Sequence, residues 1–258
     1  MSAFELEFLG TGTSGGVPLI GCQCEVCQSK DPRNQRLRSS VRIRTSRCEI
    51  IIDCGPDFRQ QMLRSKTSQI DAILLTHEHM DHVAGLDEVR PLNYLQKKHI
   101  AVYCTDRVEE RLRVQFGYAF AEDKYPGAPS FELHRVEPNC PFEINGQVWI
   151  PILGEHGTWP VMGYRTDGLV YLTDISGMCS EQREKINGAT TLVVNALRHE
   201  KHVSHFNLKE AIEFSKSFSV SEVFFTHISH QLGLHDTVEL DLPQGMRLAY
   251  DGLIIKSP

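Results

Sequence analysis

Short apolar runs that end in polar or glycine-containing stretches recur along the chain and predict a series of strands. Runs of this length, rich in β-branched and aromatic residues, are typical of buried strands. Apolar residues spaced three or four apart predict helices between several of them, the clearest with Leu208, Ala211, Ile212 and Phe218 on one face. The expected strands are 4–9, 41–44, 48–52, 73–76, 100–104, 131–136, 148–153, 162–166, 169–172, 191–195, 223–225, 246–250 and 253–255, and the other expected helices are 58–63, 86–96 and 108–116.

Two of these elements carry a more specific prediction. In 41–44, Val41 and Ile43 alternate with two arginines, which indicates a half-exposed strand with the arginines toward solvent. In 86–96, Pro91 predicts a kink or break, because proline cannot continue the helical hydrogen bonding. The stretch 120–127 has no regular pattern, and a lid or rim role for this region (117–130) is left open.

Several strands end in a residue of the kind that binds metal ions. The strand 73–76 runs into His77-x-His79-x-Asp81-His82, and later strands end near His156, Asp174 and His227. Imidazole and carboxylate are ligands for divalent metals, and the histidine motif is too rich for one tetrahedral ion. Side chains at strand ends on one sheet edge would converge, so the sequence predicts a two-metal hydrolase. Asp53, also at a strand end, could orient a metal-bound histidine or cap a turn.

The eight cysteines fall into one cluster and five isolated residues. Cys22, Cys24 and Cys27 have C-x-C-x2-C spacing, which favours a structural zinc with a fourth ligand from elsewhere; redox cysteines are the alternative. The isolated cysteines are expected to be small buried hydrophobic residues. They are Cys48, Cys54, Cys104, Cys140 and Cys179.

Composition limits the function classes. The chain has 258 residues, 41% of them hydrophobic, and a net charge of −6, so there is no strong nucleic-acid signal. No apolar run approaches a membrane span, the N-terminus lacks a signal-peptide pattern, and the cysteines lack disulfide-scaffold density; we therefore expect a cytoplasmic protein without membrane contact. The arginines in 33–44 could recognise a terminal phosphate or form a solvated strand face. The glycine run 10–16 could approach a phosphate or make a tight turn beside the active site.

These residues resemble the metallo-β-lactamase superfamily. The resemblance rests on Thr76-His77-x-His79-x-Asp81-His82 followed by the three later residues in the expected order, and it covers the whole chain as one domain, 1–258. It implies a four-layered αββα sandwich with a dinuclear site at one edge. One metal would take His77, His79 and His156, the other would take Asp81, His82 and His227, and Asp174 would bridge them. Aspartate at the bridging place, where β-lactamases of this superfamily often carry cysteine, argues against lactam hydrolysis.

Within that superfamily, the chain resembles phosphoribosyl cyclic phosphate phosphodiesterases of carbon–phosphorus lyase pathways. The matching pieces are Gly10-Thr11-Gly12, the three-cysteine motif, Thr226-His227-Ile228-Ser229-His230-Gln231 and Asp251-Gly252. The resemblance implies a structural zinc held by Cys22, Cys24, Cys27 and His230. It also implies a catalytic role for His205, which precedes Asn207-Leu208, and a homodimer. His199 and His202 have no counterpart and are expected to be surface residues.

The chemistry expected of such a site is hydrolysis of a small cyclic phosphodiester. Two metals can share a hydroxide that is nucleophilic near neutral pH, with Asp81 holding both a metal and the nucleophile. His205 would supply a proton or stabilise the phosphoryl charge. The resemblance implies 5-phosphoribosyl 1,2-cyclic phosphate, opened to ribose 1,5-bisphosphate, as the substrate. Manganese or zinc would suit the active site, and zinc the thiolate site.

Three other functions are kept as alternatives. The first is a 2′,3′-cyclic nucleotide or RNA 3′-end phosphodiesterase, although no long Gly/Pro/Lys insertion suggests an RNA-binding arm. The second is a thioester hydrolase of the glyoxalase type, for which the end of the chain is short. The third is a non-catalytic metal-binding or cofactor-biosynthesis protein, which a complete ligand set and His205 disfavour.

Overall fold

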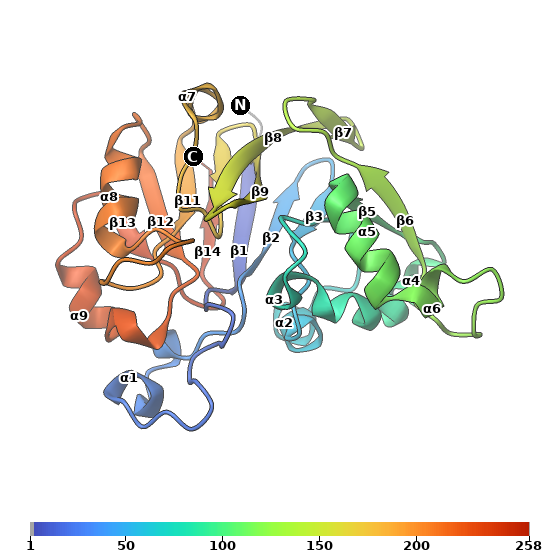
Figure 1. Cartoon of the computed structure of the whole chain (residues 1–258), viewed down its shortest axis with the longest axis horizontal. Coiled ribbons are helices and arrows are strands. Elements are labelled where there is room, and N and C mark those ends of the chain that lie inside the picture. The colour runs from blue at the N-terminus through green and yellow to red at the C-terminus, as the bar shows by residue number, and fades with distance from the viewer. Residues whose placement is uncertain (1–2, 258) are drawn as a thin grey trace.

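Two mixed sheets form the centre of the protein in the computed structural model, which describes residues 3–257 (Figure 1). In the first sheet, β1 to β3 pair antiparallel and β3 to β6 pair parallel. Its strand order is β14 (Ile254–Lys256), β1 (Phe4–Gly10), β2 (Ser40–Thr45), β3 (Glu49–Ile52), β4 (Ala72–Leu74), β5 (Ile100–Cys104) and β6 (Phe131–Arg135).

The second sheet pairs β10 to β13 in parallel, and a long antiparallel hairpin, β8 with β9, extends it. Parallel strands place their carboxyl ends on one edge, where the following loops meet. The strand order is β13 (Met246–Leu248), β12 (Glu222–Thr226), β11 (Thr191–Asn195), β10 (Leu169–Tyr171), β9 (Trp159–Thr166), β8 (Gln147–His156) and β7 (Phe142–Ile144).

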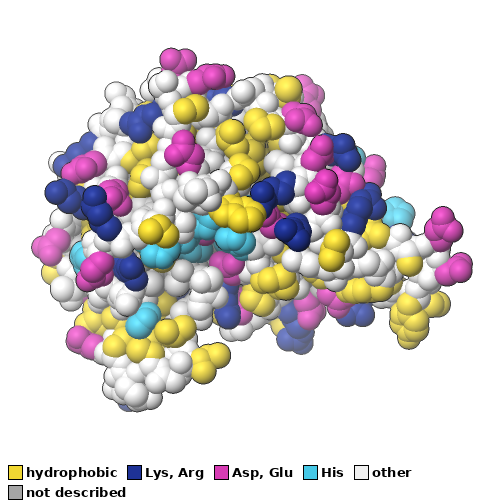
Figure 2. All heavy atoms as spheres, viewed as in Figure 1, with side chains coloured by type: hydrophobic (Ala, Val, Ile, Leu, Met, Phe, Trp, Pro, Cys, Tyr) yellow, Lys and Arg dark blue, Asp and Glu magenta, His cyan; other side chains and the backbone are white. Residues whose placement is uncertain are grey.

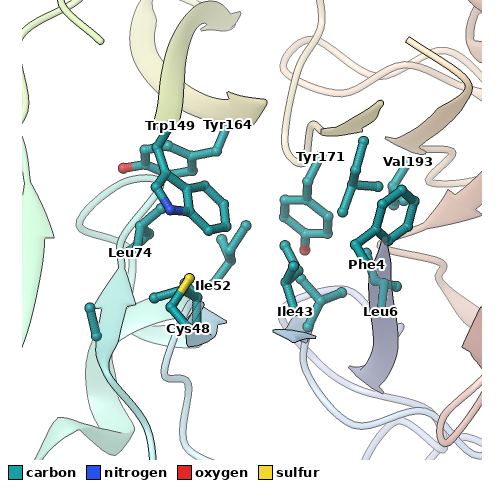
Figure 3. Close-up of a cluster of buried hydrophobic side chains, with 14 of the residues drawn as sticks. Phe4, Leu6, Ile43, Cys48, Ile52, Leu74, Trp149, Tyr164, Tyr171 and Val193 are labelled. Atoms are coloured by element: carbon teal, nitrogen blue, oxygen red, sulfur yellow. The ribbon is translucent and has the colours of Figure 1, made fainter. Parts of the chain in front are cut away.

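Three hydrophobic cores hold these layers together. The sheets face each other across a core that includes Leu74, Trp149 and Tyr171 (Figure 3). A second core lies under the helices that cover the first sheet, α2 (Phe58–Ser65), α4 (Arg90–Gln96) and α5 (Asp106–Gln115). A third lies under α8 (Leu208–Lys216) and α9 (His235–Leu240) on the second sheet. The order helix, sheet, sheet, helix confirms the predicted αββα sandwich.

The predicted elements are present, with small shifts at their ends. The break expected near Pro91 is confirmed, since a 3-10 helix (Ala84–Val89) gives way to α4, whose first turn contains the proline. Short elements escaped the sequence prediction because each offers too few residues for a periodic pattern. They are β7, α1 (Glu25–Gln28), α3 (Met80–Val83), α6 (Gly117–Phe120), α7 (Ser180–Glu184), α9 and the 3-10 helices Pro32–Asn34 and His230–Leu232. No helix within residues 3–257 is both long and apolar enough to cross a membrane.

Two expectations about burial are wrong. Arg42 does not face solvent: its side chain is buried and forms an ion pair with buried Glu7 on the neighbouring strand, which supplies the charge that a buried guanidinium needs. Among the isolated cysteines, Cys48, Cys54 and Cys104 are buried as expected, but Cys140 and Cys179 are exposed. Both exposed thiols lie outside the strands, where a neighbouring apolar run does not fix burial.

The arginine-rich segment does not form a basic patch. Arg33 pairs with Asp31 and Asp236, Arg38 with Asp57, and Arg44 with Glu5 and Glu49. Arg36 is buried and donates hydrogen bonds to the Thr11 hydroxyl and the Ala249 carbonyl. Each arginine therefore has its own partners within the protein and helps to join the N-terminal segment to the rest of the fold. This disfavours phosphate recognition by the cluster.

Glycines allow the chain to pack tightly around the histidine motif. A Cβ added to Gly55 would lie 2.0 Å from the Asp81 carbonyl oxygen, and one added to Gly85 would lie 2.0 Å from the Gly55 carbonyl oxygen. The backbone here is fixed by hydrogen bonds from the Cys54 amide to the His82 carbonyl and from the Gly85 amide to the Cys54 carbonyl. The position of the histidine motif therefore depends on backbone-to-backbone contact that excludes any side chain.

We predict that Gly55→Ala destabilises the protein and lowers its metal content, because the new methyl group must push the motif carrying Asp81 outward. Overpacking of this kind costs about 1–3 kcal/mol. Thermal unfolding and elemental analysis measure the two effects. Gly117→Ala is the matched control, since a Cβ there meets nothing within 4 Å. Equal melting temperatures and equal metal content in the two variants would contradict the packing argument.

Candidate metal centre

The predicted metal-binding residues meet at one edge of the two sheets. His77 to His82 follow β4, His156 ends β8, Asp174 follows β10 and His227 follows β12. Histidine side chains gather in the middle of the face seen in Figure 2, with hydrophobic and Lys or Arg side chains beside them. Loops far apart in the sequence therefore form a single site, as the strand ends predicted.

One group of donor atoms comes from His77, His79 and His156, whose ligand atoms lie within 4.8 Å of one another. The His77 Nε2 and His79 Nδ1 atoms are 3.0 Å apart. Two nitrogens bound to one tetrahedral zinc lie about 3.3 Å apart, given Zn–N bonds of roughly 2.0–2.1 Å. The three imidazoles can thus face a common ion.

A second group comes from Asp81, His82, Asp174 and His227. The His82 Nε2 lies 3.2 Å from an Asp81 carboxylate oxygen and 3.3 Å from Asp174 Oδ2, and the His227 Nδ1 lies 3.1 Å from the same Asp174 oxygen. Asp174 also groups with His156 and His205. It is therefore the residue that touches both halves of the cluster, which is the place of a bridging ligand.

Neighbouring groups fix which nitrogen faces the cluster in two of the imidazoles, those of His82 and His156. The His82 Nδ1 is 2.6 Å from Asp53 Oδ2, and the His156 Nδ1 is 2.8 Å from the Asp174 carbonyl and 2.9 Å from the Ser204 carbonyl. Because these oxygens accept, each Nδ1 donates, and the Nε2 is the atom of each ring that an ion would bind, in exchange for any proton it carries. Asp53 also accepts hydrogen bonds from the amide and hydroxyl of Thr76, so it lies in the orienting position that the sequence suggested.

Three residues of the site have left-handed backbone: Asp53 (φ 66), Asp174 (φ 58) and His227 (φ 55). This conformation is uncommon for residues with a side chain and persists where the surroundings enforce it, often at functional sites. It turns the chain sharply at the end of a strand. The carboxylates and the imidazole thereby point back over the sheet edge.

The electrostatics of the cluster show strong mutual stabilisation. Burial would raise the pKa of Asp174, but His227 and His82 hold it well below the usual range. Burial acts against a charged His82, yet Asp174, Asp81 and Asp53 raise its pKa well above normal. Burial also lowers the pKa of His77 well below its usual range and that of His205 to about 3. At neutral pH the centre thus holds ionised carboxylates among closely packed imidazoles.

The donor set fits a pair of divalent ions. Among the described residues, His82 Nε2 and His205 Nδ1 are buried without a hydrogen-bond partner, although buried polar atoms rarely lack one. His82 Nε2 points at two carboxylates, which is the arrangement a shared cation would satisfy. Two ions held here would lower the pKa of a water molecule between them and withdraw charge from bound oxyanions.

A second candidate site lies on the segment that carries α1, which projects away from the sheets (Figure 1). The ligand atoms of Cys22, Cys24, Cys27 and His230 group within 4.8 Å, and the Cys22 and Cys24 sulfurs lie 3.4 and 3.3 Å from His230 Nδ1. Sulfur and nitrogen on one tetrahedral zinc lie about 3.6 Å apart. The hydrogen bond to His230 lowers the pKa of Cys24 to about 6, while burial raises that of Cys27 to about 11. The geometry fits the zinc site that the resemblance implied.

The three histidines of the loop after β11 differ in burial and in distance from the centre. His205 is buried beside the centre, with its ring centroid 4.7 Å from that of His156 and 4.9 Å from that of His227. His199 is exposed, as expected. His202 was expected at the surface, but it is half-buried, and its ring centroid lies 5.0 Å from that of His205 at the site.

Sequence reasoning missed two polar residues of the site. The Ser39 hydroxyl lies 3.2 Å from His227 Nδ1 and donates to the Gly12 carbonyl, and the Thr76 hydroxyl lies 3.0 Å from His77 Nδ1. Thr76 precedes the histidine motif, which was a usable signal. Ser39 had none, because serine is common and its partners lie far away in sequence.

Comparison with known proteins agrees with this geometry. Residues 49–228 match the family model described as a beta-lactamase superfamily domain. A solved structure described as a new diphosphatase from the PhnP family is 38% identical and superposes with a TM-score of 0.92, over 99% of this chain and 97% of that one.

Two curated relatives carry other names. An octanoyltransferase of Porphyromonas gingivalis is 38% identical over 95% of this chain, and a ribonuclease Z of Acaryochloris marina is 31% identical over 62% of it. The chain spans only about half the length of these two relatives, 50% and 46% respectively. The PhnP-family protein, by contrast, is matched over nearly its whole length. The chain therefore belongs to the beta-lactamase superfamily, and within it to the PhnP family.

Proposed function

We propose that this protein is a phosphodiesterase that uses two divalent metal ions to hydrolyse a small phosphodiester. The observation that carries the proposal is the placement of Asp174 between His156 and His205 on one side and His82 and His227 on the other. One carboxylate shared by two imidazole groups is suited to hold two ions a few ångströms apart, and paired ions of this kind suit in-line displacement at phosphorus. The PhnP-family and ribonuclease Z relatives support chemistry at phosphorus.

The ligand assignment is part of this proposal. One ion would be held by His77, His79 and His156, and the other by Asp81, His82 and His227, with Asp174 between them. Manganese or zinc suits imidazole and carboxylate ligands. Asp53 and the carbonyls of Asp174 and Ser204 keep the ring nitrogens of the ligands turned toward the ions. Asp81, which is less buried than His82, Asp174 and His227, would also position the attacking water.

His205 would act on the substrate rather than on a metal. Its Nδ1 is buried without a hydrogen-bond partner among the described residues and lies 3.7 Å from Asp174 Oδ1. A phosphoryl or leaving-group oxygen bound at the centre would satisfy this nitrogen, and the hydrogen bond would strengthen as negative charge develops. We propose this contact as its catalytic role.

The proposed substrate is 5-phosphoribosyl 1,2-cyclic phosphate, opened to ribose 1,5-bisphosphate. A diphosphate ester is the second candidate, favoured by the description of the similar PhnP-family protein as a diphosphatase. Both present a phosphorus with two ester or anhydride oxygens to the same metal pair. They differ in the leaving group, which is a sugar alkoxide in the first and a phosphate oxygen in the second.

One substrate screen separates these functions. Protein supplied with Mn²⁺ or Zn²⁺ is expected to hydrolyse bis-p-nitrophenyl phosphate and the cyclic ribose phosphate, and to leave precursor RNA and a thioester unchanged. Cleavage of a diphosphate ester in preference to the cyclic ribose phosphate would select the second candidate. Thioester cleavage alone, or no activity on any phosphorus substrate, would overturn the proposal.

We predict about three divalent ions per chain, two in the active site and one zinc at the cysteine cluster. Asp174→Ala should lose the active-site pair and keep the zinc, because it removes the shared carboxylate only. Cys24→Ser should do the opposite. Elemental analysis of both variants after equal metal supply measures this. If each variant loses every ion in the same proportion, the two sites are not separate.

We predict that His205→Ala keeps both active-site metals but lowers kcat on the cyclic ribose phosphate by about 10²–10⁴-fold, the usual range for a positioned acid–base group. Steady-state kinetics and elemental analysis on the same preparation check this. His199→Ala is the matched control, because His199 is exposed on the same loop. Near wild-type turnover of His205→Ala would remove His205 from the mechanism, and loss of metal would make it a ligand.

We propose separately that the protein forms a homodimer, as the family resemblance implies. Exposed apolar side chains on the segment carrying the cysteine cluster, Leu19 and fully exposed Ile20 at 96%, are compatible with a partner surface. Light scattering of the metal-loaded protein gives its mass in solution.

A further inference from the structure

Residues 198–205 form a closed turn in the loop between β11 and α8, beside the metal centre. The ends of this turn are joined by a hydrogen bond from the Leu208 amide to the Arg198 carbonyl, 2.9 Å. Within the turn, the Ser204 carbonyl lies 2.9 Å from Nδ1 of the candidate ligand His156. The side chains of the turn therefore have a defined position relative to the metal centre.

Arg198 is a half-buried cation without a carboxylate partner. Its Nη1 donates to Gln231 Oε1 at 2.9 Å and its Nη2 donates to the Lys201 carbonyl at 3.3 Å, and both acceptors are uncharged. Its Nε is buried without a hydrogen-bond partner among the described residues. Each terminal nitrogen keeps a second N–H for a ligand. A partly desolvated charge gains more from a counter-ion than an exposed one does, so an anion beside Arg198 would be stabilised.

His202 adds a hydrogen-bond donor next to the proposed catalytic histidine. Its ring centroid lies 5.0 Å from that of His205, and the Ser204 amide donates to its Nδ1 at 3.4 Å. Because an amide N–H only donates, Nδ1 accepts, and the neutral ring carries its proton on Nε2. Burial and the nearby charge of Arg198 lower the pKa of His202, which keeps the ring neutral at neutral pH. Its Nε2–H can therefore donate to an anion.

The other cations near the centre are already neutralised. Lys201 is 87% exposed at its side chain and lies 3.7 Å from a carboxylate oxygen of Glu210. Arg107 donates to Glu78 of the histidine motif at 2.6 Å, which forms an ion pair. Arg198 differs from both, because no described carboxylate pairs with it. Its charge is therefore the one that remains available to a substrate.

We propose that Arg198 and His202 form a subsite for a terminal phosphate monoester of the substrate, next to the phosphodiester held at the metal centre. The inference rests on the proposed phosphodiesterase function and states how the site would select a phosphorylated sugar. In the proposed cyclic ribose phosphate, one methylene group separates the 5-phosphate from the ribose ring. His205 would then face the reacting phosphorus, and His202 and Arg198 would face the second phosphate. A guanidinium presents paired N–H groups that match phosphate oxygens.

The kinetic test compares two substrates that differ only in this phosphate: 5-phosphoribosyl 1,2-cyclic phosphate and ribose 1,2-cyclic phosphate. For the manganese-loaded protein, kcat/KM should be higher for the phosphorylated compound. Arg198→Ala should lower the ratio of the two kcat/KM values by about 10- to 100-fold, as expected for a lost charge-assisted hydrogen bond. Arg198→Lys should lower it less, because the charge is kept and the paired N–H groups are lost.

Two further variants make the result specific. Lys209→Ala is the matched control, because it removes a positive charge from α8 that is 82% exposed and lies 3.9 Å from Glu213. It should leave the ratio unchanged. His202→Ala should lower the ratio, and it decides the matter if Arg198→Ala also loses zinc through its missing bond to Gln231. An unchanged ratio in His202→Ala and Arg198→Ala, with both substrates slowed equally, would make these residues structural.

A binding test stands apart from turnover. Isothermal titration calorimetry with ribose 5-phosphate should give a Kd for the metal-loaded protein that rises about 10-fold or more in Arg198→Ala and stays constant in Lys209→Ala. If neither cyclic phosphate is hydrolysed but the Kd rises, the phosphodiesterase proposal fails and the subsite stands. If both cyclic phosphates are hydrolysed at the same rate and the Kd does not change, the subsite proposal fails alone.

Discussion

A carboxylate buried among imidazoles is the constraint on which the site depends. Asp174 is 2% exposed, and its negative charge is held in place by His227 and His82. A lone buried carboxylate would be too costly to remain ionised. The surrounding rings reduce that cost, and divalent ions would reduce it further. The same close packing of imidazoles around Asp174 thus balances its charge and forms the geometry that would bind metal. The buried carboxylates of the site can therefore stay ionised in the folded protein only beside these imidazoles or bound ions.

That requirement explains the unusual backbone around the centre. The left-handed residues Asp53, Asp174 and His227 each follow a buried strand, and each carries a polar side chain of the cluster. The tight contact between Gly55 and the Asp81 carbonyl also helps to hold the histidine motif in position. Packing of the buried strands stabilises the fold, and part of this stabilisation offsets the backbone strain at the strand ends.

The sequence predicted the strands and the candidate metal-binding residues from local signals, and the order of the layers from the family resemblance. Apolar runs set the strands, and those that lead into the site are followed within one to three residues by His77, His156, Asp174 or His227. What could not be predicted depends on pairing across the sheet. Arg42 is buried because Glu7 lies beside it on β1. Cys140 is exposed, although a cysteine is more often buried. Ser39 and the hydrogen bond from Arg198 to Gln231 likewise join segments that only the tertiary fold brings together.

The cysteine cluster gains a structural meaning from its connections. His230 lies three residues after His227, and Ile228 between them exchanges backbone hydrogen bonds with Thr11 and Thr13 of the N-terminal glycine run. The same run accepts a hydrogen bond from Ser39, which contacts His227. An ion held by Cys22, Cys24, Cys27 and His230 would therefore fix the segment that positions His227. Gly10 and Gly12 of that run are needed for backbone contact, because a Cβ on Gly10 would lie 1.9 Å from the Arg38 carbonyl oxygen and one on Gly12 would lie 2.8 Å from that of Arg36.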